Sequence, residues 1–483
     1  MKQISIILLI TILLGILISC GENEVNPQSS NDPNNDAAES GEISFENQIE
    51  YMNLSGYEIR FVVRGGTTGD LAVFDCIDLY ADELIGDLIN DAVYERNIFL
   101  EEKYNFKINV TTIAVPDYPG NVIRRSVMSS EDLYDVAYDG FNWTLSMVQE
   151  NMLTDLYTLP HINFSKPYWR ENINKDLSLG NKLYLTFGEH MLSINAGLYG
   201  VFFNKAIAED LDVENLYNTV RDNKWTIEKY YNLSKGVVTD LNGDGIFDFY
   251  DLWGTTTQTH NAYTFLIASG EKIADKDEND FLELSLNNPR AVSVLELSAE
   301  FLMDKTATMI VDPDAERLWR IFPEGRALFS EGALMQTPGM RNMEVDFGIL
   351  PNPKFEETQE RYYHTPSVWN ACLMLVPVTI TQPEIIGYIL ELLAAKSTDT
   401  LTPAYYDLQL THKLTRDEES GKMLDIMFST VTFDMGAAFN FGGLLSMVIN
   451  VGARGTNFAS SYQSAENRAQ VEIDKLTDVL KGE

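Results

Sequence analysis

The chain has 483 residues, with 35 basic and 72 acidic side chains and a formal net charge of −37 at pH 7. A surface this negative repels phosphate backbones and argues against nucleic-acid binding. Three cysteines are too few for a disulfide scaffold or a multi-cysteine metal centre. Hydrophobic residues make up 45% of the chain, which is typical of a protein with a packed core in two or three folded parts.

Residues 1–19 have the pattern of an export signal. Lys2 precedes an almost wholly apolar run at 4–18, which is shorter than the roughly 20 residues that span a bilayer. The run ends in Leu17-Ile-Ser-Cys20, which resembles a bacterial lipobox. We therefore expect cleavage before Cys20 and acylation of its thiol, which would anchor the chain to a membrane. The alternative is a plain secretory signal with a chance cysteine.

A polar, acidic segment follows. Residues 21–50 contain eight acids, no base and one aromatic residue, Phe45, so the segment cannot bury enough apolar surface to fold. We predict a lipidated flexible tether over 20–50, with a typical reach of about 25–30 Å. Once Cys20 is acylated, Cys76 and Cys372 remain, and they either form a disulfide or stay two separate buried thiols.

The body shows alternating strand and helix patterns. In the first part we predict strands over 56–64, 106–115 and 133–138, and a helix over 82–104. Further along we predict strands over 199–204 and 370–378, and helices that begin at Thr226, Pro289, Pro383 and Ser464. This alternation indicates an α/β protein with parallel strands.

Several short segments occur along the chain in an order that is typical of one protein family. They are residues 90–97 with 101–104, 134–136 with 153–156, 199–205, 224–226 and 322–329, in addition to the lipobox and the tether. Together they resemble the extracellular solute-binding proteins of bacterial ABC importers, in the group that includes the sugar-binding lipoproteins. The resemblance extends over nearly all of residues 56–480.

The resemblance implies a periplasmic-binding-protein-like α/β fold, with two α/β lobes that are joined by crossing hinge strands and close over a ligand. By this analogy, lobe 1 holds 51–157 and 366–420, and lobe 2 holds 158–365 and 421–483. It also implies a monomeric, non-enzymatic binding protein at the extracellular face of the cell membrane. Its partners would be a small solute, expected to be a carbohydrate, and the subunits of an ABC transporter permease.

Candidate ligand contacts follow from the strand ends, because open parallel sheets bind ligands at the carboxyl ends of their strands. Sugars are bound by aromatic faces and by planar polar side chains. The candidates are Arg64, Asp139, Asn142, Trp143, Tyr199, Arg341 and Trp369. The alternatives are that Trp143 and Trp369 are core residues and that Arg341 pairs with a surface acid.

A second motif lies at residues 240–251, where oxygen-bearing residues have the spacing of a calcium-binding EF-hand loop. The predicted calcium ligands are Asp240, Asn242, Asp244, the carbonyl of Ile246, Asp248 and Asp251. Asp251 replaces the usual glutamate, and the following sequence does not predict a second helix. We expect a structural calcium ion, with a solvated acidic turn as the alternative.

Two other functions are open from the sequence. One is a secreted, calcium-stabilised enzyme that acts on polysaccharides with two carboxylates. The other is a surface adhesion or scaffolding lipoprotein without an enclosed pocket. The sequence has no G-x-S-x-G, H-E-x-x-H, Walker or C-x-x-C motif, but glycosidases carry no short universal signature.

Overall fold

The computed structural model describes residues 44–68, 72, 74–311, 320–340, 343–368, 371–410 and 418–482. The chain divides into two units, Met1–Glu42 and Ile43–Glu483, and every described residue belongs to the second unit. The predicted export signal, Cys20 and most of the predicted tether therefore lie outside the described residues. Within the part of the chain that is described, no helix is both long and apolar enough to cross a membrane.

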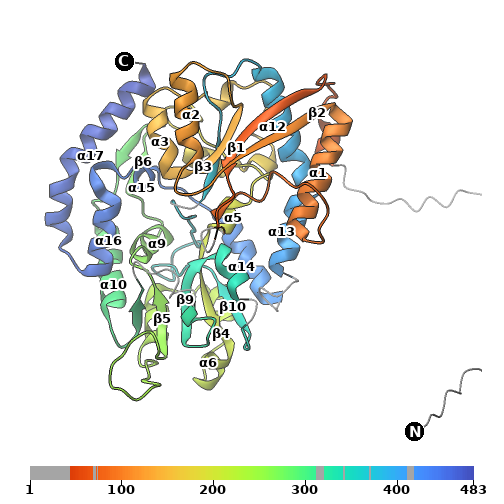
Figure 1. Cartoon of the computed structure of the whole chain (residues 1–483). Helices are drawn as coiled ribbons and strands as arrows, with labels where there is room; N and C mark the ends of the chain where they lie inside the picture. The colour runs from red at the N-terminus through yellow and green to blue at the C-terminus, as the bar shows by residue number, and fades with distance from the viewer. Residues whose placement is uncertain are drawn as a thin grey trace, which may run out of the picture. The chain divides into compact units, whose positions relative to one another are not determined.

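The first of two main sheets has the strand order β11-β3-β1-β2 (Figure 1). Its strands are β1 (Tyr57–Arg64), β2 (Phe106–Ile113), β3 (Val136–Gly140) and β11 (Cys372–Leu375). β1 pairs in parallel with β2 and β3, whereas β11 runs antiparallel to β3. Most of β1 and all of β3 are buried, as expected for strands that are covered on both faces.

The second main sheet has the order β10-β4-β9-β5-β8. Its strands are β4 (Tyr199–Asn204), β5 (Trp253–Thr257), β8 (Thr308–Ile310), β9 (Ala327–Ala333) and β10 (Phe347–Leu350). β5 is parallel to β8 and β9, whereas β4 is antiparallel to β9 and β10. Both main sheets are thus mixed and not purely parallel, because strands return to each sheet from the opposite direction. A small antiparallel pair is formed by β6 (Ala274–Lys276) and β7 (Leu282–Leu284).

Two chain segments cross between the main sheets and pair with each other. The segment before β4 meets the segment before β11, where Leu198 forms an antiparallel bridge with Pro366. The Ser367 amide also donates to the Gly197 carbonyl at 2.9 Å. The short helix α5 (Ser193–Ala196) contacts both β11 and the 3-10 helix η5 (Leu334–Met340) that follows β9 (Figure 1). Two helix-covered sheets that are joined by crossing segments confirm the predicted α/β fold class.

Helices cover the two sheets in separate groups. Near the first sheet lie α1 (Leu88–Tyr104), α2 (Pro119–Met128), α3 (Phe141–Gln149), α4 (Glu171–Leu177), α12 (Pro383–Ser397) and α13 (Leu401–Leu410). The other helices are α6 (Lys205–Asp210), α7 (Leu216–Arg221), α8 (Ile227–Ser234), α9 (Asn261–Ala268), α10 (Pro289–Met303), α14 (Glu418–Ser429), α15 (Met435–Phe439), α16 (Leu444–Arg454) and α17 (Phe458–Lys481). The shorter 3-10 helices are η1 (Glu46–Gln48), η3 (Leu156–Thr158), η4 (Pro167–Trp169) and η6 (Phe441–Gly443).

All strands of the first sheet fall in the ranges predicted for lobe 1, and all strands of the second sheet fall in the ranges predicted for lobe 2. The helices do not all follow this division, because α4 lies near the first sheet although its residues fall in the range predicted for lobe 2. Helix α13 packs on α1, whereas α14 packs on β10 and α7. The lobe boundaries themselves stay a prediction.

The first predicted helix begins later than its sequence pattern indicates. The Asp87 carboxylate accepts hydrogen bonds from the amides of Ile89 and Asn90, at 3.1 and 3.0 Å, and so caps α1 at Leu88. Leu84 and Ile85 have helical spacing but are 55% and 64% exposed, so burial does not hold this stretch in a helix. The last helix, in contrast, starts earlier than predicted, at Phe458.

Residues 44–50, which the sequence assigns to the tether, pack against the folded body. Glu46 is 1% exposed and accepts a hydrogen bond from Lys103 Nζ at 2.8 Å and another from the hydroxyl of Tyr104. The ring of Phe45 lies edge-on to Tyr168, with centroids 5.4 Å apart. The buried Glu46 carboxylate with its two donors and the Phe45 ring contact hold this polar segment against the body.

Candidate functional site

Arg64 and Asp139 meet at the carboxyl end of the first sheet, as their positions after neighbouring strands predict. Arg64 ends β1 and Asp139 lies near the end of β3. Their side chains are 3% and 0% exposed, and Arg64 Nη2 lies 3.5 Å from Asp139 Oδ1. A buried guanidinium beside a buried carboxylate keeps each charge compensated.

The Asp139 carboxylate also holds the local backbone in place. It accepts hydrogen bonds at 2.7 Å from the amide of Gly120, in the first turn of α2, and from its neighbour Gly140. Burial raises the pKa of Asp139, while the Gly120 amide, the Arg64 charge and the Gly140 amide oppose the rise. Asp139 is therefore a residue that positions Arg64 and α2.

Arg64 has binding capacity that its neighbours leave unused. Its guanidinium carbon lies 5.7 Å from the ring centroid of Tyr118, next to the start of α2. Its Nε–H is buried and has no hydrogen-bond partner among the described residues. Because an unsatisfied buried donor is costly, this N–H is a candidate to gain a partner when a polar ligand binds.

A second polar group lies at one end of the other main sheet. Tyr199 begins β4, and its ring packs against His260 with centroids 4.8 Å apart and ring planes tilted by 39°. His260 Nε2 lies 4.0 Å from Glu331 Oε2, and the same carboxylate accepts a hydrogen bond from the hydroxyl of Thr257 at 2.9 Å. These residues come together at one end of the sheet, because β9 pairs antiparallel with β4 and parallel with β5.

Burial sets the charge of Glu331. The residue is 1% exposed, and burial raises its pKa to about 8, although hydrogen bonds with Thr257 and Thr264 lower it. The carboxyl group is therefore mostly neutral at pH 7 and can both donate and accept a hydrogen bond. An aromatic ring beside a neutral carboxylic acid and an imidazole is chemically suited to a hydroxylated ligand.

Both groups adjoin the crossing segments. Tyr199 directly follows Leu198, which pairs with Pro366 of the other segment. On the first sheet, Asp139 pairs with Leu373 of β11, the strand that the other segment enters. The two polar groups therefore lie next to the segments that connect the sheets.

The predicted contacts are only partly brought together. Arg64 lies beside Asp139, while Tyr199 belongs to the group on the second sheet. Asn142 and Trp143 lie in the first turn of α3, directly after β3, and their side chains are outside the description. Arg341 and Trp369 lie outside the described residues, so their roles stay predictions.

Sequence reasoning missed His260 and Glu331. Glu331 carries a recognisable signal, since it is the one charged residue in the strand sequence ALFSEGA, whose seven residues are all buried. A lone acid in such a strand needs partners. His260 carries no comparable local signal, because its neighbour in space lies on a different element.

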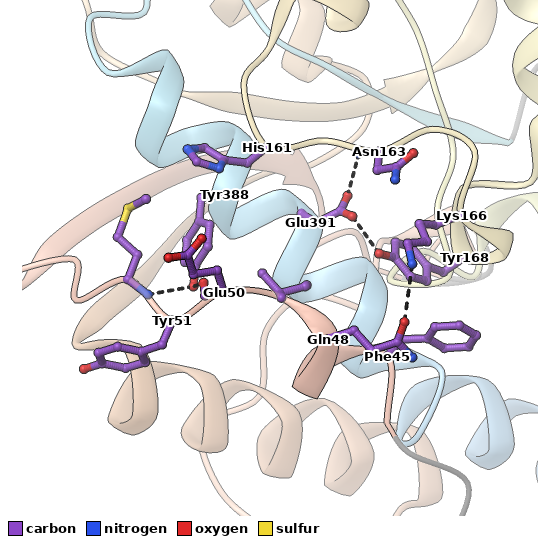
Figure 2. Close-up of a pocket in the computed structure, with 12 residues that line it drawn as sticks. Phe45, Gln48, Glu50, Tyr51, His161, Asn163, Lys166, Tyr168, Tyr388 and Glu391 are labelled. Atoms are coloured by element: carbon purple, nitrogen blue, oxygen red, sulfur yellow. Dashed lines mark hydrogen bonds between the residues drawn. The ribbon is translucent and has the colours of Figure 1, made fainter.

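A separate pocket lies where the N-terminal segment docks (Figure 2). Its volume is about 450 Å³, and its lining comes from residues 45–52, residues 161–168 and helix α12. The hydroxyl of Tyr168 donates to Glu391 at 2.6 Å, and that of Tyr388 donates to the Glu50 carbonyl at 2.6 Å. The Tyr388 bond holds the segment to the body, whereas the Tyr168 bond joins two parts of the body itself. We therefore interpret the pocket as a gap that remains where the segment packs against the body.

The predicted calcium loop forms an exposed turn whose carboxylates bind backbone amides. Asp240 accepts from the amides of Gly243 and Gly245, at 2.7 and 2.8 Å. Asp251 accepts from the amides of Leu241 and Asp248, each at 2.9 Å. The Asp248 amide is the main cause that lowers the pKa of Asp251. Gly245 has φ +77°, the left-handed turn that the motif requires at this position.

The remaining predicted ligands belong to the same turn. Asn242 Nδ2 donates to Asp244 at 3.1 Å, and Ile246 is 63% exposed. Carboxylate and amide oxygens are the donors that calcium prefers. Among the described residues, however, no group of three or more histidine, cysteine or acidic side chains is placed to hold a metal ion. The loop oxygens accept hydrogen bonds from groups within the turn itself, and calcium binding stays a prediction.

Comparison with protein-family models and with curated proteins finds no match. Among solved structures, the ABC substrate-binding protein Lmo0181 from Listeria monocytogenes in complex with cycloalternan has 13% sequence identity and a TM-score of 0.53, over 87% of this chain and 99% of that chain. A cyclo/maltodextrin-binding protein complexed with maltotetraose has 12% identity and a TM-score of 0.56, over 87% and 99% of the two chains.

The maltose-binding periplasmic protein MalE from Listeria monocytogenes in complex with maltose gives a similar result. It has 12% identity and a TM-score of 0.55, over 87% of this chain and 98% of that chain. At such identities the likeness establishes the fold. This chain has the α/β fold of ABC sugar-binding proteins, in agreement with the fold that the sequence resemblance implies.

Proposed function

We propose that this chain captures a small carbohydrate between its two halves and releases it unchanged. The observation that carries the proposal is the pair of buried polar edges, Arg64 with Asp139 and Tyr199 with His260 and Glu331, next to the segments that join the two sheets. The structural neighbours support it, because they are complexes with cycloalternan, maltotetraose and maltose.

The proposed mechanism is hinged closure. The paired crossing segments at Leu198 and Pro366 would bend, and the predicted lobes, 51–157 with 366–420 and 158–365 with 421–483, would close on the sugar. Arg64 Nε–H would gain an oxygen partner from the ligand, while the ring of Tyr199 would pack on the C–H face of a sugar. Closure shifts the equilibrium from the open form to the closed form of the protein and breaks no covalent bond.

The membrane anchor, the transporter partner and the calcium ion are part of the same proposal. Acylated Cys20 would anchor the chain at the extracellular face of the cell membrane, and the closed form would dock on the permease subunits of an ABC transporter. A calcium ion in loop 240–251 would stabilise the second half without contacting the sugar. Each of these statements rests on a sequence motif or on the family resemblance.

Titration of the full chain with maltose, maltotetraose and cycloalternan tests the proposal by calorimetry and thermal unfolding. A sugar that binds the native state raises the melting temperature, by the equivalent of about 2.7 kcal/mol at a hundredfold excess over Kd. Arg64→Gln is expected to weaken binding at least tenfold, and the exposed Arg125→Gln serves as the matched control. Melting of each unliganded variant shows whether it is folded.

The outcomes separate the functions. A sugar that stabilises the protein and is recovered intact supports capture, whereas shorter products found by chromatography support the polysaccharide-acting enzyme. No binding of any of the three sugars at millimolar concentration by a folded wild-type chain would refute the proposed ligand class.

A further inference from the structure

Two cysteine side chains from distant parts of the chain meet at the carboxyl edge of the first sheet. Cys76 lies in the segment after β1, and Cys372 is the first residue of β11. Neither of them forms a disulfide in the structure. The Cys76 amide is bound to the Arg64 carbonyl at the end of β1, and Cys372 pairs with Gly140 at the end of the neighbouring β3. This placement brings the two side chains close together, and Cys372 is the main cause that raises the pKa of Cys76.

The backbone around Cys76 holds its side chain in this position. The Cys76 amide donates to the carbonyl of Arg64 at 2.9 Å, which closes the segment after β1 into a loop. Within that loop, the Thr67 amide donates to the Asp75 carboxylate at 2.9 Å. Cys76 is partly exposed at the loop's end.

Cys372 is fixed even more firmly. It pairs with Gly140 of β3, and its carbonyl accepts a hydrogen bond from the Ser193 hydroxyl at 2.7 Å. Its exposure is 1%. Because β3 lies between β1 and β11 in the sheet, the two cysteines lie on either side of the end of β3.

We propose that Cys76 and Cys372 are a modification site, at which an external disulfide oxidises the two thiols to one intramolecular disulfide. The Cys76 thiolate attacks one sulfur of the oxidant, forms a mixed disulfide and releases one thiol. The sulfur of Cys372 then loses its proton and attacks Cys76, forming the internal bond and releasing the second thiol. The two protein thiols are oxidised, and one external disulfide is reduced to two thiols.

The chemical setting predicts how the reaction depends on pH. The hydrogen bond to Cys372 and burial raise the pKa of Cys76, while the charge of Arg64 acts in the opposite direction. Since the thiolate is the attacking species, oxidation should accelerate as the pH rises above neutrality. The product would join the loop after β1 to β11 beside Arg64. This step does not depend on whether the protein binds a sugar.

Peptide mapping of the full chain tests the proposal. Protein purified under reducing conditions is incubated with oxidised glutathione at pH 8, then unfolded, alkylated with iodoacetamide and digested. We expect a peptide that contains Cys76 linked to one that contains Cys372, the loss of two alkylatable thiols, and reversal by dithiothreitol. The oxidised protein should melt at a higher temperature than the reduced protein. The Cys76→Ser, Cys372→Ser double variant should melt at the same temperature with and without oxidant.

A Cys20→Ser background removes the third thiol, so that the count refers to the pair alone. The proposal is overturned if both thiols stay alkylatable after oxidation of folded protein. It is also overturned if Cys76 stops at a mixed disulfide with glutathione, or if elemental analysis finds a metal ion bound by the two thiols in place of the crosslink. The wild-type measurement needs no variant, so a misfolded substitution does not obscure the result.

Discussion

Glu331 gives the sharpest prediction, because its charge is tied to the pH dependence of folding. Burial raises the pKa of this carboxyl group from 4.5 to about 8. A raised pKa means that the folded state holds a proton that the unfolded state has lost, so stability falls as the pH rises through this window. We therefore expect the free energy of unfolding to decrease between pH 4.5 and pH 8 on account of this one group.

The magnitude follows from the pKa difference. One pKa unit corresponds to about 1.4 kcal/mol, so Glu331 lowers the stability by roughly 3 kcal/mol at pH 7 and about 5 kcal/mol at pH 8 and above. Glu331→Gln keeps the shape and the hydrogen-bonding capacity but cannot ionise. The free energy of unfolding of the variant, relative to wild type, should increase by about 1.4 kcal/mol for each pH unit across this range.

Urea unfolding at half-unit pH steps measures the difference, with the exposed Glu278→Gln as a matched control for removal of one acid. The groups that face Glu331 are His260, Thr257 and Thr264. A difference between Glu331→Gln and wild type that stays constant from pH 5 to pH 8 would show that Glu331 is charged in the folded state. In that case the assignment of a neutral acid is wrong.

Three further predictions concern other parts of the chain. Burial lowers the pKa of His364 to about 3, so its contribution to stability is complete above pH 6.5 and is lost as the pH falls toward 3; His364→Gln should flatten acid unfolding by up to about 1.4 kcal/mol per pH unit. Cys20→Ala should move the protein from the membrane fraction to the soluble fraction, and its retention in membranes on immunoblots would contradict lipid anchoring. Wild-type protein should melt at a higher temperature in calcium than in chelator, and Asp244→Ala should remove that difference; wild-type melting that is indifferent to chelator would contradict the calcium site.

The sequence predicts the elements well where local chemistry alone defines them. Strand β4 matches its prediction at both ends because an apolar run lies in the middle of the second sheet. The proline at 289 sets the start of α10, with Asn288 accepting from the Ala291 amide at 3.0 Å. Helix α1 was predicted too long, because Leu84 and Ile85 have the right spacing but no core to contact.

The site was less predictable, because its contacts join distant elements. The position of Arg64 beside Asp139 follows from adjacent parallel strands, and it could be expected from strand ends alone. The contact of Glu331 with His260 joins β9 to the turn before α9, and no spacing rule links them. Cys76 and Cys372 illustrate the same limit, since a pair of single cysteines in the sequence carries no information about proximity until the order of the strands is known.

The late arrival of β11 has a consequence for biogenesis. Residues 57–140 supply three strands of the first sheet, but the strand that covers β3 is encoded at 372–375. A ribosome must therefore finish most of the polypeptide before this sheet can be completed, and until then β3 has an open edge. If the chain is exported as its first 19 residues predict, its earliest sheet would still be incomplete while the chain passes through a translocation channel.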